Sequence, residues 1–261
     1  MLLSFYITYI LLFTLITSSF LTIANLASDT LSKLLDFMKV LAPTYFLSIA
    51  YSSGSRTSMV FYEATLIIIT IVDFLLIKVA VPCINIYLIL VLVNNISKED
   101  YLSKFTDLIE TGVKWALKTL LSAVLGYNVI QGMIVPALDS VKKSFLLRAS
   151  ASLPGIGNAL EGVTKTIYGT GVLVKNAIGV VGLIVILVIV LVPLIKLAVY
   201  AIVYKVGTAL IQPISDKRIL NSMNGVSEAA VLLLYTVFIG AVLFFITIAI
   251  ITTSTNYGLG G

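Results

Sequence analysis

The sequence predicts an all-α, polytopic integral membrane protein, a helical bundle of about seven spans. Of the 261 residues, 59% are hydrophobic and 11% are charged, whereas about a quarter of residues are charged in soluble globular proteins. The mean hydropathy is +1.11. Apolar runs of about 20 residues recur along the chain, and each is long enough to cross the hydrocarbon core of a bilayer as a helix. A membrane β-barrel would instead show short segments of alternating polarity, and the sequence has no such pattern.

The expected spans cover about 2–24, 34–53, 58–79, 82–96, 117–137, 177–204 and 228–252. No basic residue precedes the first apolar run, which favours a retained membrane helix over a signal peptide. The second span starts amphipathic, with Lys33, Asp36 and Lys39 on a polar face, and we expect it to bend or break near Pro43. The third and fourth spans are expected to meet at Pro82 in a tight turn or a kinked hairpin.

Two further segments are too polar for ordinary spans. Residues 98–116 predict an amphipathic helix that lies in the membrane plane or caps the bundle, with a solvated connector helix as the alternative. Asp100–Lys104 and Glu110–Lys114 are i,i+4 pairs in the favourable order on this helix. Residues 150–176 combine several glycines with one apolar helical face, so we expect a re-entrant hairpin or a short helix packed over the bundle.

The chain is expected to form a single membrane domain over 1–261. Residues 2–137 supply its N-terminal helices, 141–252 form a core with the glycine-rich segment and the last two spans, and 253–261 form a flexible tail. Strict alternation of seven spans puts eight of the 17 basic residues on one side and nine on the other. The excess of cytoplasmic Lys and Arg that orients most membrane proteins therefore gives no orientation here.

Several kinds of chemistry are excluded by residues that the chain lacks. It has no histidine, which removes His metal ligands and a Ser-His-Asp triad, and its one cysteine, Cys83, cannot form an intrachain disulfide. The pairs Gly155-x-Gly157 and Gly169-x-Gly171 lack the third glycine of a dinucleotide site, and no P-loop sequence is present. A net charge of +5 without a basic, aromatic-rich module argues against nucleic-acid binding. A catalytic Ser–Lys pair is the remaining alternative, and no spacing in the sequence favours it. We therefore expect no cofactor and no enzymatic activity.

Three ionisable residues are expected within spans: Glu63, Asp73 and Lys196. A charge at the centre of a membrane helix costs about 2.5–3.5 kcal/mol on insertion scales, so each should face a partner, the bundle interior or water. Asp73 is the strongest candidate for a pore-lining group, and an interhelical hydrogen bond that serves only packing is the alternative. Asp73 and Lys78 are five residues apart, more than about 100° around an α-helix, so we expect them to be poor partners. Lys196 could also extend to an interface.

Short motifs in the second half of the chain carry a family resemblance. They are Leu153-Pro154-Gly155-Ile156-Gly157, Lys175-Asn176-Ala177-Ile178-Gly179, Pro193, Tyr204-Lys205 and Gln212-Pro213-Ile214-Ser215-Asp216-Lys217-Arg218. In order, spacing and hydrophobic framing, these motifs resemble the stage III sporulation protein AE family, polytopic membrane proteins of endospore-forming bacteria. The resemblance is specific over about 141–252 and looser before that.

The resemblance implies a subunit of a multiprotein complex that links mother cell and forespore and sustains forespore development after engulfment. Implied partners are the lipid bilayer, other membrane and ring-forming subunits and a cytoplasmic ATPase, and the chain could also form a homo-oligomer. The implied location is the mother-cell membrane that surrounds the forespore. The candidate pore, gate or assembly residues are Glu63, Asp73, Pro154, Gly155, Gly157, Lys175, Asn176, Lys196, Pro213, Asp216, Lys217 and Arg218.

Three functions remain in competition at this point. The favoured one is a channel or export-gate-like subunit that depends on its partners. The second is an assembly scaffold of the same complex that conducts nothing. The third is a secondary transporter, which is less favoured because the two halves of the chain show no convincing internal repeat.

Overall fold

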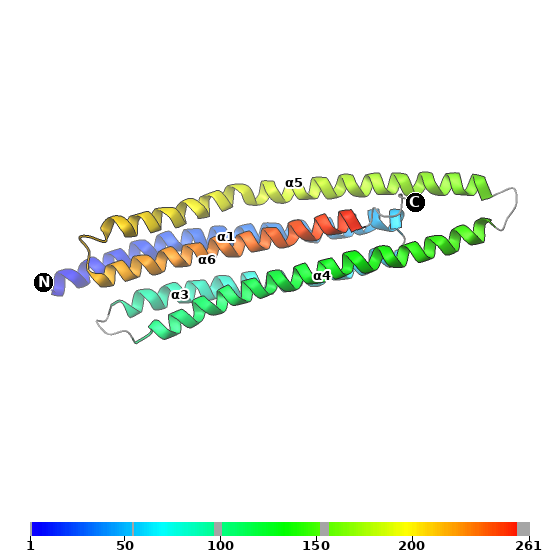
Figure 1. The fold of residues 1–261 in the computed structure, drawn as a ribbon. Coiled ribbons are helices and arrows are strands. Elements are labelled where there is room, and N and C mark those ends of the chain that lie inside the picture. Colours follow the sequence, from blue (N-terminus) through cyan, green and yellow to red (C-terminus); the bar gives the residue numbers. More distant parts are fainter. Residues whose placement is uncertain (1, 54, 97–100, 152–156, 255–261) are drawn as a thin grey trace. The chain divides into compact units, whose positions relative to one another are not determined.

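A computed structural model describes the backbone of residues 2–53, 55–96, 101–151 and 157–254. Side chains are described at 7–50, 58–96, 101–133, 166 and 169–253. All regular structure in these ranges is helical, as the sequence predicts (Figure 1). The elements are α1 (Leu2–Ser53), α2 (Ser55–Val72), the π-helix η1 (Asp73–Ala80), α3 (Val81–Asn94), α4 (Ser103–Ala151), α5 (Gly157–Ile211) and α6 (Lys217–Ser254).

Four helical stretches, not seven, are long and apolar enough to cross a membrane among the described residues. They are Ile7–Ala50, Ser58–Asn94, Gly169–Ile211 and Lys217–Thr253. The expected spans 2–24 and 34–53 lie in the single helix α1, which continues through Pro43 instead of breaking there. The expected span 117–137 lies in α4, its residues 134–137 are outside the described side chains, and the described part of α4 is not among the four.

The expected turn at Pro82 is also wrong. Elements α2, η1 and α3 follow one another without interruption, so spans 58–79 and 82–96 form one helical run. Pro82 lies in the first turn of α3, where an ordinary α-helix would bring its ring against the carbonyl of Lys78. The turn before it is widened: the Val81 N–H donates to the carbonyl of Leu76, five residues back. The π-helix therefore carries the chain past the proline.

Two segments that were expected to be separate elements belong to longer helices. Residues 103–116 are the first turns of α4, so they do not form an independent interfacial helix. Residues 157–176 open α5, which does not support a re-entrant hairpin over 150–176, and 152–156 lie outside the described residues. Helix α6 reaches Ser254, and the rest of the expected tail is likewise not described.

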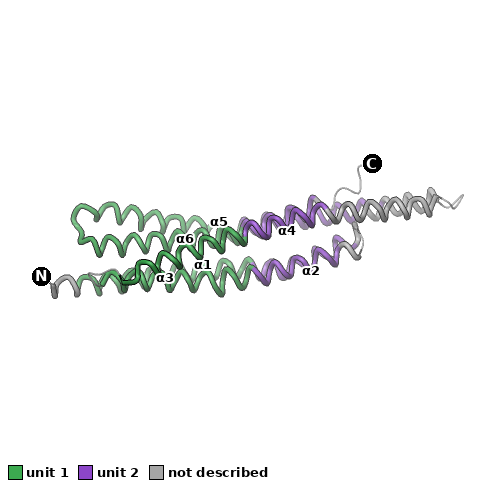
Figure 2. The backbone as a smooth tube through the Cα atoms, turned by 60° about the horizontal axis from the view of Figure 1, so that its bottom comes forward, with its two compact units in different colours: residues 1–34, 72–120, 188–241 green, residues 35–71, 121–187, 242–261 purple. Residues whose placement is uncertain are grey.

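The described chain divides into two compact units (Figure 2). Unit 1 contains residues 1–34, 72–120 and 188–241, and unit 2 contains 35–71, 121–187 and 242–261. In unit 1, Gly225 of α6 lets Val91 of α3 pack directly on the α6 backbone, and Gly240 does the same for Leu31 and Leu76. The core of this unit therefore centres on α6.

In unit 2, α5 supplies the glycines that allow close packing. A side chain at Gly179 would collide with Thr252 of α6 and Tyr45 of α1, and one at Gly182 would meet Leu41 of α1. The sequence spacing Gly179-x-x-Gly182 is typical of close helix packing, and the structure shows these two glycines in that role. The same unit holds an apolar cluster of buried residues from three helices: Tyr45, Ile49, Phe61 and Ile251, with Ile178 packed against them.

Candidate functional site

The inward face of α5 in unit 2 carries a fully buried lysine. Residues Gly171, Lys175, Gly179, Gly182 and Ile186 are buried at intervals of three or four, so they share one face of the helix. Lys175 has 0% of its surface exposed. Burying an ammonium group in an apolar environment is costly unless polar groups surround it. Apolar packing alone therefore does not account for a buried lysine at this position.

A hydrogen-bonded pair lies one helical turn from Lys175, at Gly179. The hydroxyl oxygens of Tyr45 and Thr252 are 2.5 Å apart. Thr252 donates its own proton to the carbonyl of Ile248 at 2.7 Å, so the Tyr45 hydroxyl is the donor in the pair. Because Gly179 has no side chain, α5 approaches both residues closely. Helices α1, α5 and α6 therefore meet at one polar joint, which we define as Tyr45, Gly179 and Thr252.

Helix α4 brings a second polar contact to unit 2. The Asn128 side-chain amide donates to Thr247 Oγ1 of α6 at 3.1 Å and to the Val124 carbonyl of its own helix at 2.9 Å. Thr247 in turn donates to the Leu243 carbonyl at 2.7 Å. Four buried polar atoms of this unit have no hydrogen-bond partner among the described residues: Ser48 Oγ, Asn128 Oδ1, Gln131 Nε2 and Asn176 Oδ1. Nearly all buried polar groups in proteins are hydrogen-bonded, so this interior can accept water or another polar group.

The two candidate carboxylates lie in different surroundings. Asp73, at the start of η1, is 30% exposed at its side chain and forms an ion pair with Lys78 at 3.3 Å. Glu63 of α2 and Lys196 of α5 are exposed, so neither faces the protein interior. Exposed apolar side chains surround Lys196 along the helix, including Val192, Ile195 and Val199.

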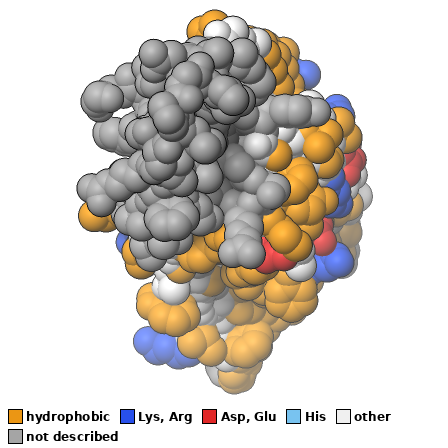
Figure 3. All heavy atoms as spheres, turned by 90° about the vertical axis from the view of Figure 1, so that its right-hand side faces the viewer, with side chains coloured by type: hydrophobic (Ala, Val, Ile, Leu, Met, Phe, Trp, Pro, Cys, Tyr) orange, Lys and Arg blue, Asp and Glu red, His pale blue; other side chains and the backbone are white. Residues whose placement is uncertain are grey.

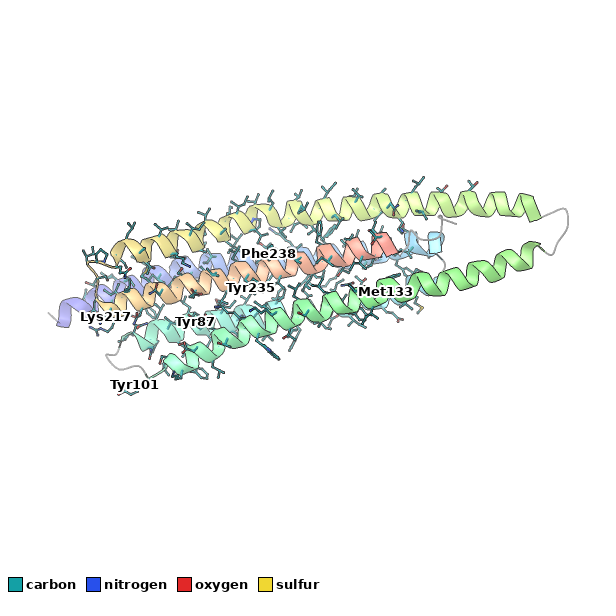
Figure 4. The ribbon with its side chains drawn as sticks, viewed as in Figure 1. Tyr87, Tyr101, Met133, Lys217, Tyr235 and Phe238 are labelled. Carbon is teal, nitrogen blue, oxygen red and sulfur yellow. The ribbon has the colours of Figure 1, made fainter. Side chains whose placement is uncertain are left out.

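The segment 211–218 forms the turn between α5 and α6. The amide N–H groups of Ile214 and Ser215 donate to the Ile211 carbonyl, at 3.1 and 3.0 Å. Asp216 caps α6, because its Oδ1 accepts the backbone N–H of Arg218 at 2.9 Å and the Arg218 side chain at 3.3 Å. Pro213 and Lys217 are exposed, and Lys217 is the first residue of α6 (Figure 4).

This turn is attached to other helices of unit 1. Arg218 donates to the carbonyl of Ile96, beyond the end of α3, at 3.4 Å. The buried Tyr9 hydroxyl of α1 donates to the Leu92 carbonyl at 2.6 Å and lies 2.7 Å from Ser222 Oγ. Helices α1, α3 and α6 are therefore joined at this end by hydrogen bonds from side chains.

A charged cluster joins α3, α4 and α6 in the same unit. Lys114 Nζ is 2.6 Å from Glu110 and 3.8 Å from Glu228. Tyr87, which is labelled in Figure 4, donates to Glu110 at 3.3 Å. The hydrogen bond to Glu110 raises the pKa of Lys114, partial burial opposes it, and both carboxylates add to the rise. The expected Glu110–Lys114 pair is thereby confirmed.

The outward face of α1 is polar over a membrane-length distance. Exposed side chains recur at intervals of three or four, and we call them the α1 polar stripe: Ser18, Thr22, Asn25, Asp29, Lys33, Asp36 and Lys39. Asp36 and Lys39 form an ion pair at 3.8 Å. Each of the four charges would cost about 2.5–3.5 kcal/mol if it faced lipid at the centre of a bilayer. On the face drawn in Figure 3, the described side chains are largely hydrophobic, with charged side chains gathered mainly at one edge.

The structure divides the sequence candidates instead of gathering them into one site. Unit 1 contains Asp73, Lys196, Pro213, Asp216, Lys217 and Arg218, whereas unit 2 contains Glu63, Gly157, Lys175 and Asn176. Pro154 and Gly155 lie outside the described residues, and Gly157 begins α5. Among the residues that the structure describes, no group of three or more His, Cys, Asp or Glu side chains could hold a metal ion.

Sequence reasoning missed the polar residues that contact one another across helices. Tyr9, Tyr45, Asn128, Thr247 and Thr252 belong to this group. Each lies within an apolar run and carries a hydroxyl or amide group on the buried face of its helix. Buried polar residues in transmembrane helices commonly bond across the interface, so this placement is the signal that could have identified them.

Long apolar helices that bury hydroxyl, amide and lysine side chains define a helical integral membrane protein. The chain belongs to the stage III sporulation protein AE family, whose model matches residues 1–255. It is similar to the stage III sporulation protein AE of Bacillus subtilis (strain 168), with 22% identity over 251 residues. The match covers 96% of this chain and 63% of the relative's length. No solved structure matches the chain.

Proposed function

We propose that this chain is a channel or export-gate-like membrane subunit of the sporulation complex that links mother cell and forespore. In this role it is non-enzymatic and supports forespore development after engulfment. Family membership supports the sporulation role. The observation that carries the gate-like role is the fully buried Lys175 on the same face of α5 as the polar joint.

Helix packing alone does not require a buried lysine or buried amide groups. A lysine and several amide groups inside apolar helices lower the stability of the fold relative to aliphatic residues. Their presence therefore favours a function that uses them. The polar joint can break and re-form by exchanging one hydrogen bond for another, whereas an interlocked apolar core resists such exchange. We therefore assign Lys175, Asn176 and the polar joint to a part that moves when the conduit opens.

The proposed surroundings follow from the role. The subunit lies in the mother-cell membrane around the forespore and works with other membrane subunits, ring-forming subunits and a cytoplasmic ATPase. Asp73, Glu63, Lys196 and the 213–218 turn are proposed as conduit or assembly positions. Among them, Glu63, Lys196, Pro213 and Lys217 are exposed, which suits contacts with partners.

The decisive experiment replaces Lys175 with methionine in the sporulating host and counts heat-resistant spores. Methionine keeps the unbranched shape and removes the charge, so we expect the protein to accumulate in the membrane and sporulation to stop after engulfment. Lys205→Met is the matched control, because Lys205 lies on the same helix but is exposed. Normal sporulation of the Lys175→Met strain, at normal membrane levels, contradicts the proposed gate.

Flux measurements separate a conduit from a scaffold. Vesicles that contain the purified complex are loaded with a small fluorescent tracer, and release is compared for the native chain and Lys175→Met. Release that depends on Lys175 supports a conduit. An intact complex that releases no tracer favours the scaffold, and saturable uptake of one solute by this chain alone favours a transporter.

A further inference from the structure

We propose that the outward face of α4 in unit 1 binds a helix of another protein, and that this helix carries carboxylates along one edge. The face consists of residues spaced three or four apart, which we call the α4 seam: Phe105, Leu108, Gly112, Trp115 and Thr119. At 100° per residue, the seam stays within an arc of about 80° and extends about 21 Å along the helix. Alternating spacings of three and four are those by which one helix packs along another. The inference rests on the proposed function in one respect, that the partner helix belongs to a subunit of the same complex.

The buried side of α4 fixes the direction in which the seam points. Four residues on that side are at most 7% exposed: Thr106, Val113, Leu117 and Leu120. In the seam, by contrast, Phe105 is 51% exposed, Leu108 64% and Trp115 69%. A side chain added at Gly112 would meet nothing within 4 Å. The described residues of this chain therefore leave the seam uncovered.

Helix α3 lies beside this part of α4 in the same unit. The Leu102 N–H donates to Asn94 Oδ1 at 2.8 Å, and Tyr87 donates to Glu110 at 3.3 Å. The segment 102–110 is therefore level with 87–94. The two neighbours differ in character, because 81–94 contains no charged residue and 103–118 contains five. The outward side chains of α3 are apolar and 42–49% exposed: Ile86, Ile89 and Val93.

Lipid suits the outward face of α3 but not that of α4. Lys104, Asp107 and Lys118 are exposed, and each would cost about 2.5–3.5 kcal/mol if it faced lipid at the centre of a bilayer. Phe105, Leu108 and Trp115 are in turn poorly matched to water. A protein helix satisfies both groups, because it can pack apolar side chains on the seam and bring polar groups to its edge.

The edges of the seam indicate the charge of that helix. One edge carries Lys104, Thr111 and Lys118, which we call the basic edge, and the other carries Ile109 and Ala116. Residues at these positions pair across the interface in coiled coils and determine which partner is accepted. The two lysines are separated by two seven-residue repeats. Asp107 lies further from the seam and leaves this side of the helix with a net positive charge. The basic edge therefore fits a helix with Asp or Glu at the same separation.

A second copy of this chain does not offer such an edge. In a parallel pair of α4 helices, the basic edge of one copy would face the Ile109 and Ala116 edge of the other, which has no carboxylate. In an antiparallel pair, the two basic edges would face each other and repel. Charge complementarity therefore favours a different protein over a copy.

The centre of the seam has the shape of a site for a large side chain. Gly112 lies between Leu108 and Trp115, and the space over it is open. In helix pairs of this type, a side chain of one helix inserts between residues of the other. Exposed tryptophan is a residue on which binding energy often concentrates. We therefore place the closest approach of the partner at Gly112 and Trp115.

Photocrosslinking in the sporulating host identifies what covers the seam. Leu108 is replaced in the full chain by the photoreactive amino acid p-benzoylphenylalanine. The same probe at Val203, an exposed apolar position of α5, is the control. After irradiation, the crosslinked peptide is sequenced by mass spectrometry. The Leu108 probe should label an apolar helix of another protein that has Asp or Glu at two positions about 14 residues apart, and the Val203 probe should not label it.

Three results of this experiment overturn the inference. A crosslinked dimer of this chain would show that a copy covers the seam. Labelling of lipid alone would show that the seam faces the bilayer. A labelled protein helix without carboxylates at these positions would show that the basic edge does not select the partner.

Charge reversal tests the basic edge directly. The double variant Lys104→Glu with Lys118→Glu should lower the adduct yield at least about tenfold, because like charges across an interface oppose association. Reversing the matching carboxylates of the labelled helix to lysine should restore the yield, which a misfolded variant would not allow. Lys205→Glu, at an exposed lysine of α5, is the control and should leave the yield unchanged. An unchanged yield in the double variant, or no restoration, contradicts the charge-matched edge.

Filling the space at Gly112 tests the close approach. Gly112→Leu meets nothing within this chain, so the membrane level and the melting temperature should stay normal while the adduct at Leu108 is lost. Gly207→Leu is the matched control, because Gly207 of α5 also has open space around it. A normal adduct yield with Gly112→Leu would show that no helix packs over this position.

The outcomes also separate this inference from the proposed function. If tracer flux depends on Lys175 while the Leu108 probe labels no partner helix, the conduit stands and the inference fails. If the charge-matched helix is labelled while the intact complex releases no tracer, the proposed conduit fails and the α4 seam stands as an assembly surface.

Discussion

Lys78 Nζ lies 3.3 Å from Asp73 Oδ2, although the two residues are five apart in one helical run. In an α-helix this spacing separates side chains by about 140°, and the wider π-helical turn brings them onto one side. Pro82 explains the widening, because its ring is incompatible with an α-helical turn at 78–82. The ion pair is therefore a product of the proline that follows it.

The coupling between Asp73 and Lys78 should be measurable in a double-mutant cycle. We expect Asp73→Asn, Lys78→Gln and the double variant to give a coupling free energy of about 0.2–1 kcal/mol, the range for partly exposed ion pairs. Unfolding of the purified protein in detergent provides the measurement. The more exposed Asp36–Lys39 pair is the comparison and should couple less. Zero coupling would mean that the two side chains do not meet.

Filling Gly179 should break the polar joint. Gly179→Ala places a methyl group against Thr252 and Tyr45, so we expect a loss of about 1–3 kcal/mol of unfolding free energy from overpacking. Gly207→Ala on the same helix meets nothing within 4 Å and should be neutral or stabilising. Thermal unfolding of both variants in detergent checks this pair, and equal melting temperatures would contradict the close approach.

The helix cap at Asp216 should be replaceable only by residues that accept a hydrogen bond. Asp216→Ala removes the acceptor for the Arg218 N–H and should cost about 1 kcal/mol, while Asp216→Asn keeps most of the cap. Faster proteolysis at the α5–α6 turn in the alanine variant is the expected readout. If alanine and asparagine behave alike, Asp216 acts through its charge and not as a cap.

The Lys114 cluster should make stability depend on alkaline pH. Because the folded-state pKa of Lys114 is raised above 10.5, its contribution is complete below that pH and is lost as pH rises through the folded-state value. The native protein should exceed Lys114→Met in stability near neutral pH, and the difference should shrink above pH 10.5. The exposed Lys118→Met is the control and should show a smaller difference throughout. A difference that grows with pH would have the wrong sign.

Helical class, family and the packing role of Gly179-x-x-Gly182 could be predicted from the sequence. Hydropathy and the spacing of small residues are local patterns, and the helices and close contacts that they predict are present in the structure. The number of spans could not be predicted in this way, because Pro43 and Pro82 were taken as breaks, whereas α1 continues through Pro43 and a π-helical turn precedes Pro82. Asp73–Lys78 was misjudged for the same reason, since α-helical geometry was assumed.

The candidate site, too, could be predicted only in part from local sequence patterns. Lys175 could be singled out from its motif, but the motif does not give its complete burial, which is a property of the folded chain. Contacts such as Asn128–Thr247 join residues 119 apart, and no local pattern contains that information. The α1 polar stripe was seen only in part, at Lys33, Asp36 and Lys39, because breaking the helix into two spans divided it.

The length of α5 exceeds the thickness of a membrane. Its 55 residues extend about 82 Å at 1.5 Å per residue, whereas a bilayer with its headgroups is about 40–45 Å thick. At the usual tilt of about 20°, roughly 30 Å of this helix must stand in an aqueous compartment. The turns outside the bilayer and the turns inside it therefore belong to one continuous helix, so water and lipid meet different parts of the same element.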